Sequence, residues 1–210
     1  MSTIYLAFDV ESGGLNPTKA DLLTAYFAIL DEDFNFLEDL ELALKPEGRL
    51  PFAEEGALKV NGIDLDKHVK DPKTITYLEG GQKLAAMIKR HLKKKGRYSN
   101  IIPTGYNVNF DIKWVQHYLI DEDTWDSMIH YKALDVMQDV DVLKRHGWLP
   151  PTVGNLKSAV EFFGVPMGEA HVAKDDILMT LGVWKKIHEL MESKKNGGSN
   201  QDLVSLLEAE

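Results

Sequence analysis

An almost unbroken apolar segment near the N-terminus, residues 4–10, constrains the fold more than any other feature of this sequence. It is rich in residues that favour β-structure, and such a run is typical of a strand buried on both faces. Asp9 lies inside this segment, and Glu11 follows it directly. Residues two apart on a strand project from the same face, with Cα atoms about 7 Å apart. The chain is therefore expected to aim two carboxylates into one space at the end of a buried strand.

Two interpretations of Asp9 and Glu11 are open. Exposed strands often alternate acidic and apolar residues, so an isolated Asp-x-Glu pair is compatible with a solvated edge. The neighbours Leu6, Phe8 and Val10 argue against an exposed edge here. A buried carboxylate without a partner takes up a proton, whereas a divalent cation keeps it ionised. The pattern therefore favours a metal site.

The remaining periodicity predicts a mixed α/β domain. Strand-like runs at residues 22–30 and 36–44, separated by an acidic turn at residues 31–35, predict an antiparallel meander with the first strand. Helical spacing then takes over. We expect helices around Leu84, Ile88 and Leu92, from Asn109, around Leu156, Ala159, Val160 and Phe163, and from Lys174 through Met191, with strands at residues 101–102 and 131–136. Strands followed by strands interleaved with helices indicate an α/β domain with a mixed sheet.

The domain is expected to cover residues 1–192. From residue 193 to 201 the composition changes to Ser, Lys, Asn and Gly, which bury too little apolar surface to become ordered. We therefore expect residues 193–210 to form a flexible or loosely ordered C-terminal tail. A short apolar cluster near its end would dock on a partner or on the domain itself.

Composition excludes several classes of protein. The chain has 210 residues and no cysteine, which excludes a disulfide scaffold, a thiol nucleophile and thiolate metal sites. Its longest strongly apolar stretch is far too short to cross a bilayer of about 30 Å, so we expect no membrane segment and a cytoplasmic protein. The formal charge of -9 argues against non-specific coating of nucleic acid. It still permits an enzyme that meets phosphates through bound cations.

Further candidate residues lie near predicted helix starts. Asp111 follows the predicted N-cap Asn109, where a carboxylate is also a common partner of the helix dipole, worth about 0.3–1 kcal/mol. His171 precedes Asp176 by five residues, which would put them on largely opposed faces of a continuous helix. Both can serve one site only if His171 lies in the loop before the helix, and a Pro and a Gly just upstream favour such a loop.

Three motifs taken together resemble a known superfamily. Residues 8–15, 106–111 and 171–176 read FDVESGGL, YNVNFD and HVAKDD. They are similar to the three exonuclease motifs of the DEDD superfamily in its histidine branch, which includes proofreading subunits of replicative polymerases, ribonuclease T and oligoribonuclease. Residues 60–63, VNGI, also resemble the loop before the second motif in proofreading members. The resemblance implies a ribonuclease-H-like fold, with a five-stranded mixed sheet flanked by helices.

The same resemblance implies the site. By motif position, Asp9, Glu11, Asp111 and Asp176 would hold two divalent cations, and His171 would be the general base. The residues implied to contact nucleic acid are Ser12, Gly13, Gly14, Leu15, Asn61, Asn107, Phe110 and Lys174. Leu15 and Phe110 would pack against terminal bases, although core packing explains Phe110 equally well. Backbone amides near residues 12–14 would approach the 3′-hydroxyl. A basic run at residues 93–97 either steers nucleic acid or only favours a helix end and solvent.

Ligand chemistry and resemblance together suggest an activity. Four carboxylates without sulfur suit Mg²⁺ or Mn²⁺ better than zinc. The resemblance implies a 3′-5′ exonuclease that releases nucleoside 5′-monophosphates from single-stranded DNA or RNA 3′ ends by a two-metal mechanism, with DNA slightly favoured. An RNA-trimming or oligoribonucleotide-degrading enzyme and a non-catalytic nucleic-acid-binding module of the same fold are the alternatives. Residues 201–207 resemble peptides that dock on sliding clamps, which implies a replication or repair partner.

Overall fold

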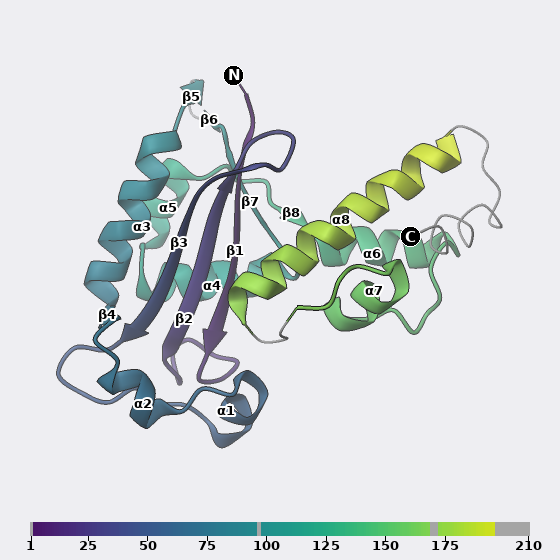
Figure 1. Ribbon diagram of the computed structural model, residues 1–210. Coiled ribbons are helices and arrows are strands. Elements are labelled where there is room, and N and C mark those ends of the chain that lie inside the picture. The colour runs from purple at the N-terminus through teal and green to yellow at the C-terminus, as the bar shows by residue number, and fades with distance from the viewer. Residues whose placement is uncertain (1, 96–97, 169–171, 196–210) are drawn as a thin grey trace.

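The computed structural model describes residues 2–95, 98–168 and 172–195, and its centre is a six-stranded sheet (Figure 1). The strand order is β4-β3-β2-β1-β7-β8. The strands are β1 (Ile4–Ser12), β2 (Leu22–Leu30), β3 (Phe36–Lys45), β4 (Thr74–Thr76), β7 (Ile101–Gly105) and β8 (Leu134–Asp135), and a separate hairpin pairs β5 (Lys94–Lys95) with β6 (Tyr98–Ser99). The helices are α1 (Glu55–Asn61), α2 (Leu65–Lys70), α3 (Tyr77–His91), α4 (Val108–Tyr118), α5 (Glu122–Met128), α6 (Val136–Arg145), α7 (Leu156–Phe163) and α8 (Ala173–Lys195).

The sheet is mixed, as predicted. β1, β2 and β3 form the antiparallel meander, while β7 joins β1 in parallel, β8 joins β7 in parallel and β4 joins β3 in parallel. The sheet has six strands instead of the five expected, because the three-residue β4 adds to the free edge of β3. So short a strand carries almost no periodicity, and its pairing depends on where α2 and α3 place it.

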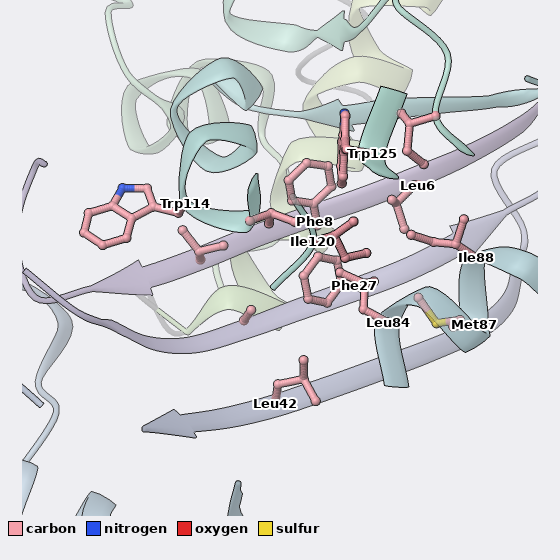
Figure 2. Close-up of a cluster of buried hydrophobic side chains, with 14 of the residues drawn as sticks. Leu6, Phe8, Phe27, Leu42, Leu84, Met87, Ile88, Trp114, Ile120 and Trp125 are labelled. Atoms are coloured by element: carbon pink, nitrogen blue, oxygen red, sulfur yellow. The ribbon is translucent and has the colours of Figure 1, made fainter. Parts of the chain in front are cut away.

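Side chains of β1 alternate between two helical layers, which explains why almost the whole strand is apolar. Leu6 and Phe8 project into the larger core, which they share with side chains of α3, α4 and α5, and Figure 2 shows Phe8 beside Trp125 of α5. Ala7 projects to the other face, which α8 covers with Ile177. A strand buried on both faces has few positions that tolerate a polar side chain, so acids at its end require a particular environment.

A second cluster lies beside the sheet, where α6, α7 and α8 pack on one another (Figure 1). Val140 of α6, Phe163 of α7 and Val183 of α8 are buried there. The predicted spacing in α7 is confirmed, and the predicted last helix begins at Ala173. This cluster packs the middle and C-terminal part of α8 against α6 and α7.

Two local predictions were wrong. The N-cap of α4 is Asn107 and not Asn109, because Asn107 takes up the left-handed conformation (φ 62°, ψ 40°) and the helix starts at Val108. The strand expected at residues 131–136 consists only of Leu134–Asp135, since the Asp135 side chain accepts the Met137 amide and starts α6. In both cases the Asp135 carboxylate is involved, because it accepts the backbone amide of Asn107 before α4 and that of Met137 at the start of α6.

The described part of α8 continues to Lys195, three residues into the segment predicted as a tail. Residues 196–210, including the segment that resembles clamp-docking peptides, lie outside the described residues. The division at residue 192 therefore stays a prediction. No helix in the described ranges is long and apolar enough to cross a membrane.

Candidate active site

Three carboxylates meet at the C-terminal end of β1. Asp9 and Glu11 come from β1 and Asp176 comes from the first turn of α8, and each offers an oxygen that lies within 4.8 Å of the others. The neighbouring residues Ala173 and Ile177 pack on the sheet and hold the start of α8 there. Asp176 thus lies near a helix start, as predicted, and the loop predicted for His171 falls outside the described residues.

Asp111 approaches the same strand from the other side. The parallel ladder between β1 and β7 ends at the pair Ala7↔Thr104, so the amide of Val10 lies beyond it. Asp111, buried in the first turn of α4, accepts a hydrogen bond from this amide through Oδ1 at 3.3 Å. Three aromatic rings follow one another along α4, where the Trp114 ring lies between Phe110 and Tyr118 with centroid distances of 6.1 and 5.8 Å.

Burial and mutual repulsion raise the pKa values of the carboxylates at the end of β1. Burial raises the pKa of Asp9 well above its usual range, and the charges of Asp111, Glu11 and Asp176 raise it further. Burial and the charge of Asp176 raise the pKa of Glu11 to about 8. Burial also raises the pKa of Asp111 well above its usual range, although the hydrogen bond from Val10 acts in the opposite direction. Ionising these acids together is therefore unfavourable, and a bound cation would relieve their repulsion.

A cation fits this donor set. Among the ion pairs recorded for the described residues, none includes Asp9, Glu11 or Asp111. Carboxylate oxygens are the ligands that hard divalent cations such as Mg²⁺ and Mn²⁺ prefer. The group Asp9, Glu11 and Asp176 has the spacing of a metal site. Asp111 lies outside that close group, and its charge still raises the pKa of Asp9.

The turn after Glu11 is shaped by the β1 irregularity between Glu11 and Ser12. The Ser12 hydroxyl donates to the Gly14 carbonyl at 2.7 Å. Gly13 donates its amide to the Asp21 carbonyl and accepts the Glu54 amide, and a Cβ at this position would lie 2.5 Å from the Phe52 carbonyl oxygen. Gly13 thus has a packing role, and its predicted contact with nucleic acid stays a prediction.

A cavity of about 340 Å³ opens directly beside Glu11. Five of the predicted contact residues line it, namely Ser12, Gly14, Leu15, Asn61 and Phe110. Leu15 is 85% exposed, which is unusual for a leucine beside buried strands and makes it available to a ligand. The far wall is formed by α1 and its N-cap through Glu54, Gly56, Ala57 and Val60. The sequence analysis predicted no contact for these residues, although Val60 belongs to the VNGI segment.

The first half of that segment ends α1, and its second half, Gly62 and Ile63, belongs to the loop that follows. Gly62 caps the helix in the left-handed conformation (φ 68°), which a glycine adopts without strain. Asn61 is thereby turned toward the site, where its Nδ2 donates to the Ser12 carbonyl at 3.2 Å and its Oδ1 accepts the Ile63 amide. Asn61 therefore joins α1 to the end of β1.

Lys174 lies on the opposite side of Glu11. It lines a smaller cavity of about 210 Å³ with Tyr26 and Glu41, and its Nζ lies 5.6 Å from the centre of the Tyr26 ring. Both cavities share Glu11 and Asn61. The two hollows therefore form a continuous surface past the carboxylates.

Asp135 is a site-supporting residue that sequence reasoning missed. Its Oδ1 accepts the Asn107 amide at 2.8 Å and the Met137 amide at 3.2 Å, so one buried carboxylate holds the starts of both α4 and α6. Asn107 is exposed, and its backbone, not its side chain, makes this contact. The only sequence signal for this role was an acidic residue directly before α6, at the end of a β-favouring run.

Two predictions fall elsewhere. His171 lies outside the described residues. The basic run at residues 93–97 begins next to the hairpin of β5 and β6, where the Asn100 amide donates to the Lys93 carbonyl, and Ile4 at the start of β1 donates to Asn100. The described part of the run therefore lies at the end of the sheet away from the carboxylates, and it does not line their cleft.

Comparison with known structures identifies the fold. No protein-family model matches the chain, and no curated protein matches it by sequence. E. coli Exonuclease I in complex with a dT13 oligonucleotide matches with a TM-score of 0.67 at 19% identity, over 88% of this chain and 40% of that one. The zinc-ion-bound form of the E. coli ExoI–ssDNA complex matches with a TM-score of 0.68 at 19% identity, over 90% and 41% of the two chains. Exonuclease I from Methylocaldum szegediense gives 0.68 at 18% identity, over 89% and 40%.

The predicted ribonuclease-H-like fold is confirmed, and the chain shares this fold with exonuclease I. The chain spans about 40% of the length of these structural neighbours.

Proposed function

We propose that the chain is a metal-dependent 3′-5′ exonuclease that shortens single-stranded nucleic acid, with DNA favoured over RNA. The observation that carries this proposal is the convergence of Asp9, Glu11 and Asp176 within 4.8 Å, with Asp111 on the adjoining strand amide. Neighbours of the same fold are described as exonucleases with bound single-stranded DNA, and one of these holds a zinc ion. These descriptions support the substrate class and the need for a cation.

The four acids would hold two divalent cations, Mg²⁺ or Mn²⁺. When bound, such a pair stabilises both the attacking and the leaving oxygen of a phosphodiester displacement. The task of the chain is to present oxygen ligands in a fixed arrangement. Asp9 and Glu11 are fixed by the β1–β2 ladder, and Asp111 is fixed by its hydrogen bond to Val10.

The cavity beside Glu11 would receive the 3′-terminal nucleotide. Leu15 and Phe110 present apolar surface there, and a base can lie against such surface whatever its sequence. The backbone amides near residues 12–14 would approach the 3′-hydroxyl. Asn61 and Lys174 flank the path on either side of Glu11.

His171 would be the general base. A neutral imidazole accepts a proton at physiological pH, and the resemblance of residues 171–176 to the third motif assigns this role to His171. We expect His171→Ala to retain metal and substrate binding but to lose about 10²–10⁴-fold in rate, measured under single-turnover conditions. Unchanged turnover in this variant would remove His171 from the mechanism.

The decisive experiment incubates the chain with 5′-labelled single-stranded DNA and RNA of the same sequence. We expect a ladder of products shortened from the 3′ end with Mg²⁺ or Mn²⁺ and an intact substrate with chelator. Faster shortening of the RNA would favour the alternative of an RNA-trimming or oligoribonucleotide-degrading enzyme. Binding of either strand without any chelator-sensitive shortening would overturn the proposal in favour of a non-catalytic binding module.

A further inference from the structure

A cavity of about 470 Å³ lies outside the carboxylate site and is walled by aromatic rings. Tyr98, His130 and Tyr131 line it, together with Ser99, Asp126 and Ile129. His130 stacks on Tyr131 with ring centroids 4.7 Å apart and planes 24° apart, and Tyr98 lies 6.0 Å from Tyr131. Tyr131 is 74% exposed and Tyr98 is 44% exposed. Such exposed and mutually aligned rings are costly to solvate and are typical of binding surfaces.

The rings are held in place by the backbone. The His130 amide donates to the Ile101 carbonyl at 2.8 Å, which ties this loop to β7. The Lys132 amide donates to Nδ1 of His130 at 3.0 Å, which fixes the orientation of the imidazole. A platform fixed before binding loses little conformational entropy when a ligand arrives.

Charges of both signs surround the platform formed by Tyr98, His130 and Tyr131. The Lys132 Nζ lies 5.9 Å from the centre of the Tyr131 ring, and the exposed Lys94 belongs to the strand paired with Tyr98–Ser99, opposite Ser99. Within the lining itself stands the carboxylate of Asp126, which accepts hydrogen bonds and repels anions. The occupant should therefore bring a flat, uncharged ring with donor groups into the cavity and keep its negative charge outside, near the lysines.

An unpaired nucleobase with its phosphates meets this description. We propose that Tyr98, His130 and Tyr131 form a second site for single-stranded nucleic acid, which stacks bases at a distance from the carboxylates. Stacking on aromatic rings is sequence-tolerant because every base has a π-face. An acidic peptide fits less well, because Asp126 would face its carboxylates.

The second site is remote from the first. Ile101, which anchors His130, pairs with Ile4 of β1, and Asp9 follows five residues later. At about 3.3 Å per strand residue this separation is about 17 Å, and a stacked strand needs about five nucleotides to cover it at about 3.4 Å each. A trinucleotide bound at the carboxylates is therefore too short to reach the platform, whereas a long strand reaches both.

The test measures binding of the full chain to a labelled 20-nucleotide single strand by fluorescence anisotropy in chelator, so that it does not depend on hydrolysis. We expect Tyr131→Ala to weaken binding about fivefold or more, and Tyr131→Phe to stay within about twofold because it keeps the ring. Phe36→Ala, which removes an exposed ring from β3 instead, should leave binding unchanged. We expect Lys132→Ala to reduce the salt dependence of binding by about 0.7 in the log–log slope, the value for one phosphate contact.

A second measurement separates this inference from the proposed function. With Mg²⁺, hydrolysis of a trinucleotide should proceed equally in wild type and Tyr131→Ala. Equal binding of the 20-nucleotide strand by wild type and Tyr131→Ala, with shortening intact, would overturn the second site alone. Binding of an acidic aromatic peptide at this surface, with no effect of Tyr131→Ala on the nucleic acid, would also overturn it.

Discussion

The carboxylates at the end of β1 and the carboxylate of Asp21 occupy opposite electrostatic situations in one small domain. The Asp21 side chain is buried, yet it accepts hydrogen bonds from both guanidinium nitrogens of Arg49, from the Phe52 amide and from the Tyr77 hydroxyl. Burial raises the pKa of Asp21, but these bonds and the Arg49 charge outweigh it, and the pKa lies below its usual value. Burial also raises the pKa of Asp9, but there the neighbouring groups are carboxylates, and their charges raise the pKa further.

The difference separates an acid whose charge the chain itself pairs from acids whose charges repel one another. Asp21 is satisfied inside the chain and holds the segment around Phe52 against Gly13. The β1 acids are left with repulsion that the described part of the chain does not neutralise, and a protein retains such a cost where a ligand relieves it. Replacing Asp9 and replacing Asp21 by asparagine should therefore have opposite effects on stability and on activity.

The largest effect is expected at Asp9. Asp9→Asn keeps the shape and removes one charge, so we expect a loss of about 10³-fold or more in single-turnover rate, since a bound cation contributes several kcal/mol to the transition state. In chelator the same variant should be as stable as wild type or more stable, because repulsion is relieved. Urea unfolding in chelator measures this, and a destabilised Asp9→Asn variant would contradict the comparison.

Asp21→Asn should behave in the reverse manner. It removes the charge that Arg49 pairs with, and we expect a loss of about 2 kcal/mol in the free energy of unfolding. This is less than the roughly 3–5 kcal/mol typical of a fully buried pair, because the Arg49 side chain is 55% exposed. Metal-dependent activity per folded molecule should change little. An Asp21→Asn variant that is stable but inactive would place Asp21 in the functional group instead.

Asp135 sharpens the comparison, because it is buried, hydrogen-bonded and still has a raised pKa. Burial is the largest cause, the amides of Asn107, Met137 and Val108 oppose it, and the charge of Asp141 adds to it. We expect Asp135→Ala to cost about 1–2 kcal/mol, the usual loss for a capping side chain, and Asp135→Asn to restore most of it. Equal losses in both variants, measured by urea unfolding, would mean that the charge and not the cap matters.

Much of the fold was readable from local pattern. The apolar run before Asp9 predicted a buried strand, and the spacing of Ile177, Leu181 and Trp184 predicted α8, because both patterns follow from the period of a single element. The failures occurred at junctions. Asn107 in its left-handed conformation and the two-residue β8 depend on a hydrogen bond between Asn107 and Asp135, which are 28 residues apart.

The site could also be predicted only in part from the sequence. The acids of β1 stood out because they are rare in such a strand, whereas Glu54 and Val60 face the cavity only because α1 folds over the end of β1. The pairing of Asp21 with Arg49 leaves no local pattern, since the two residues meet through chain reversal. Contacts that tertiary packing creates are the part that single-sequence reasoning lacks.

The smallest expected effect, and the most direct test of unrelieved repulsion, is the pH dependence of stability. Without metal, the pKa of Glu11 is raised from its usual 4.5 to about 8, so between these values the folded state holds a proton that the unfolded state has lost. Stability must then fall as the pH rises through this window. We expect the melting temperature in chelator to drop between pH 6 and pH 8.5 by a few degrees, at about 2–4 °C per kcal/mol for a chain of this size.

Mg²⁺ should raise the melting temperature more at pH 8.5 than at pH 6, because binding requires the deprotonated acids. Glu11→Gln provides the matched control and should flatten both trends, as differential scanning fluorimetry would show. A Mg²⁺-induced shift that shrinks as the pH rises would mean that these carboxylates are not the ligands.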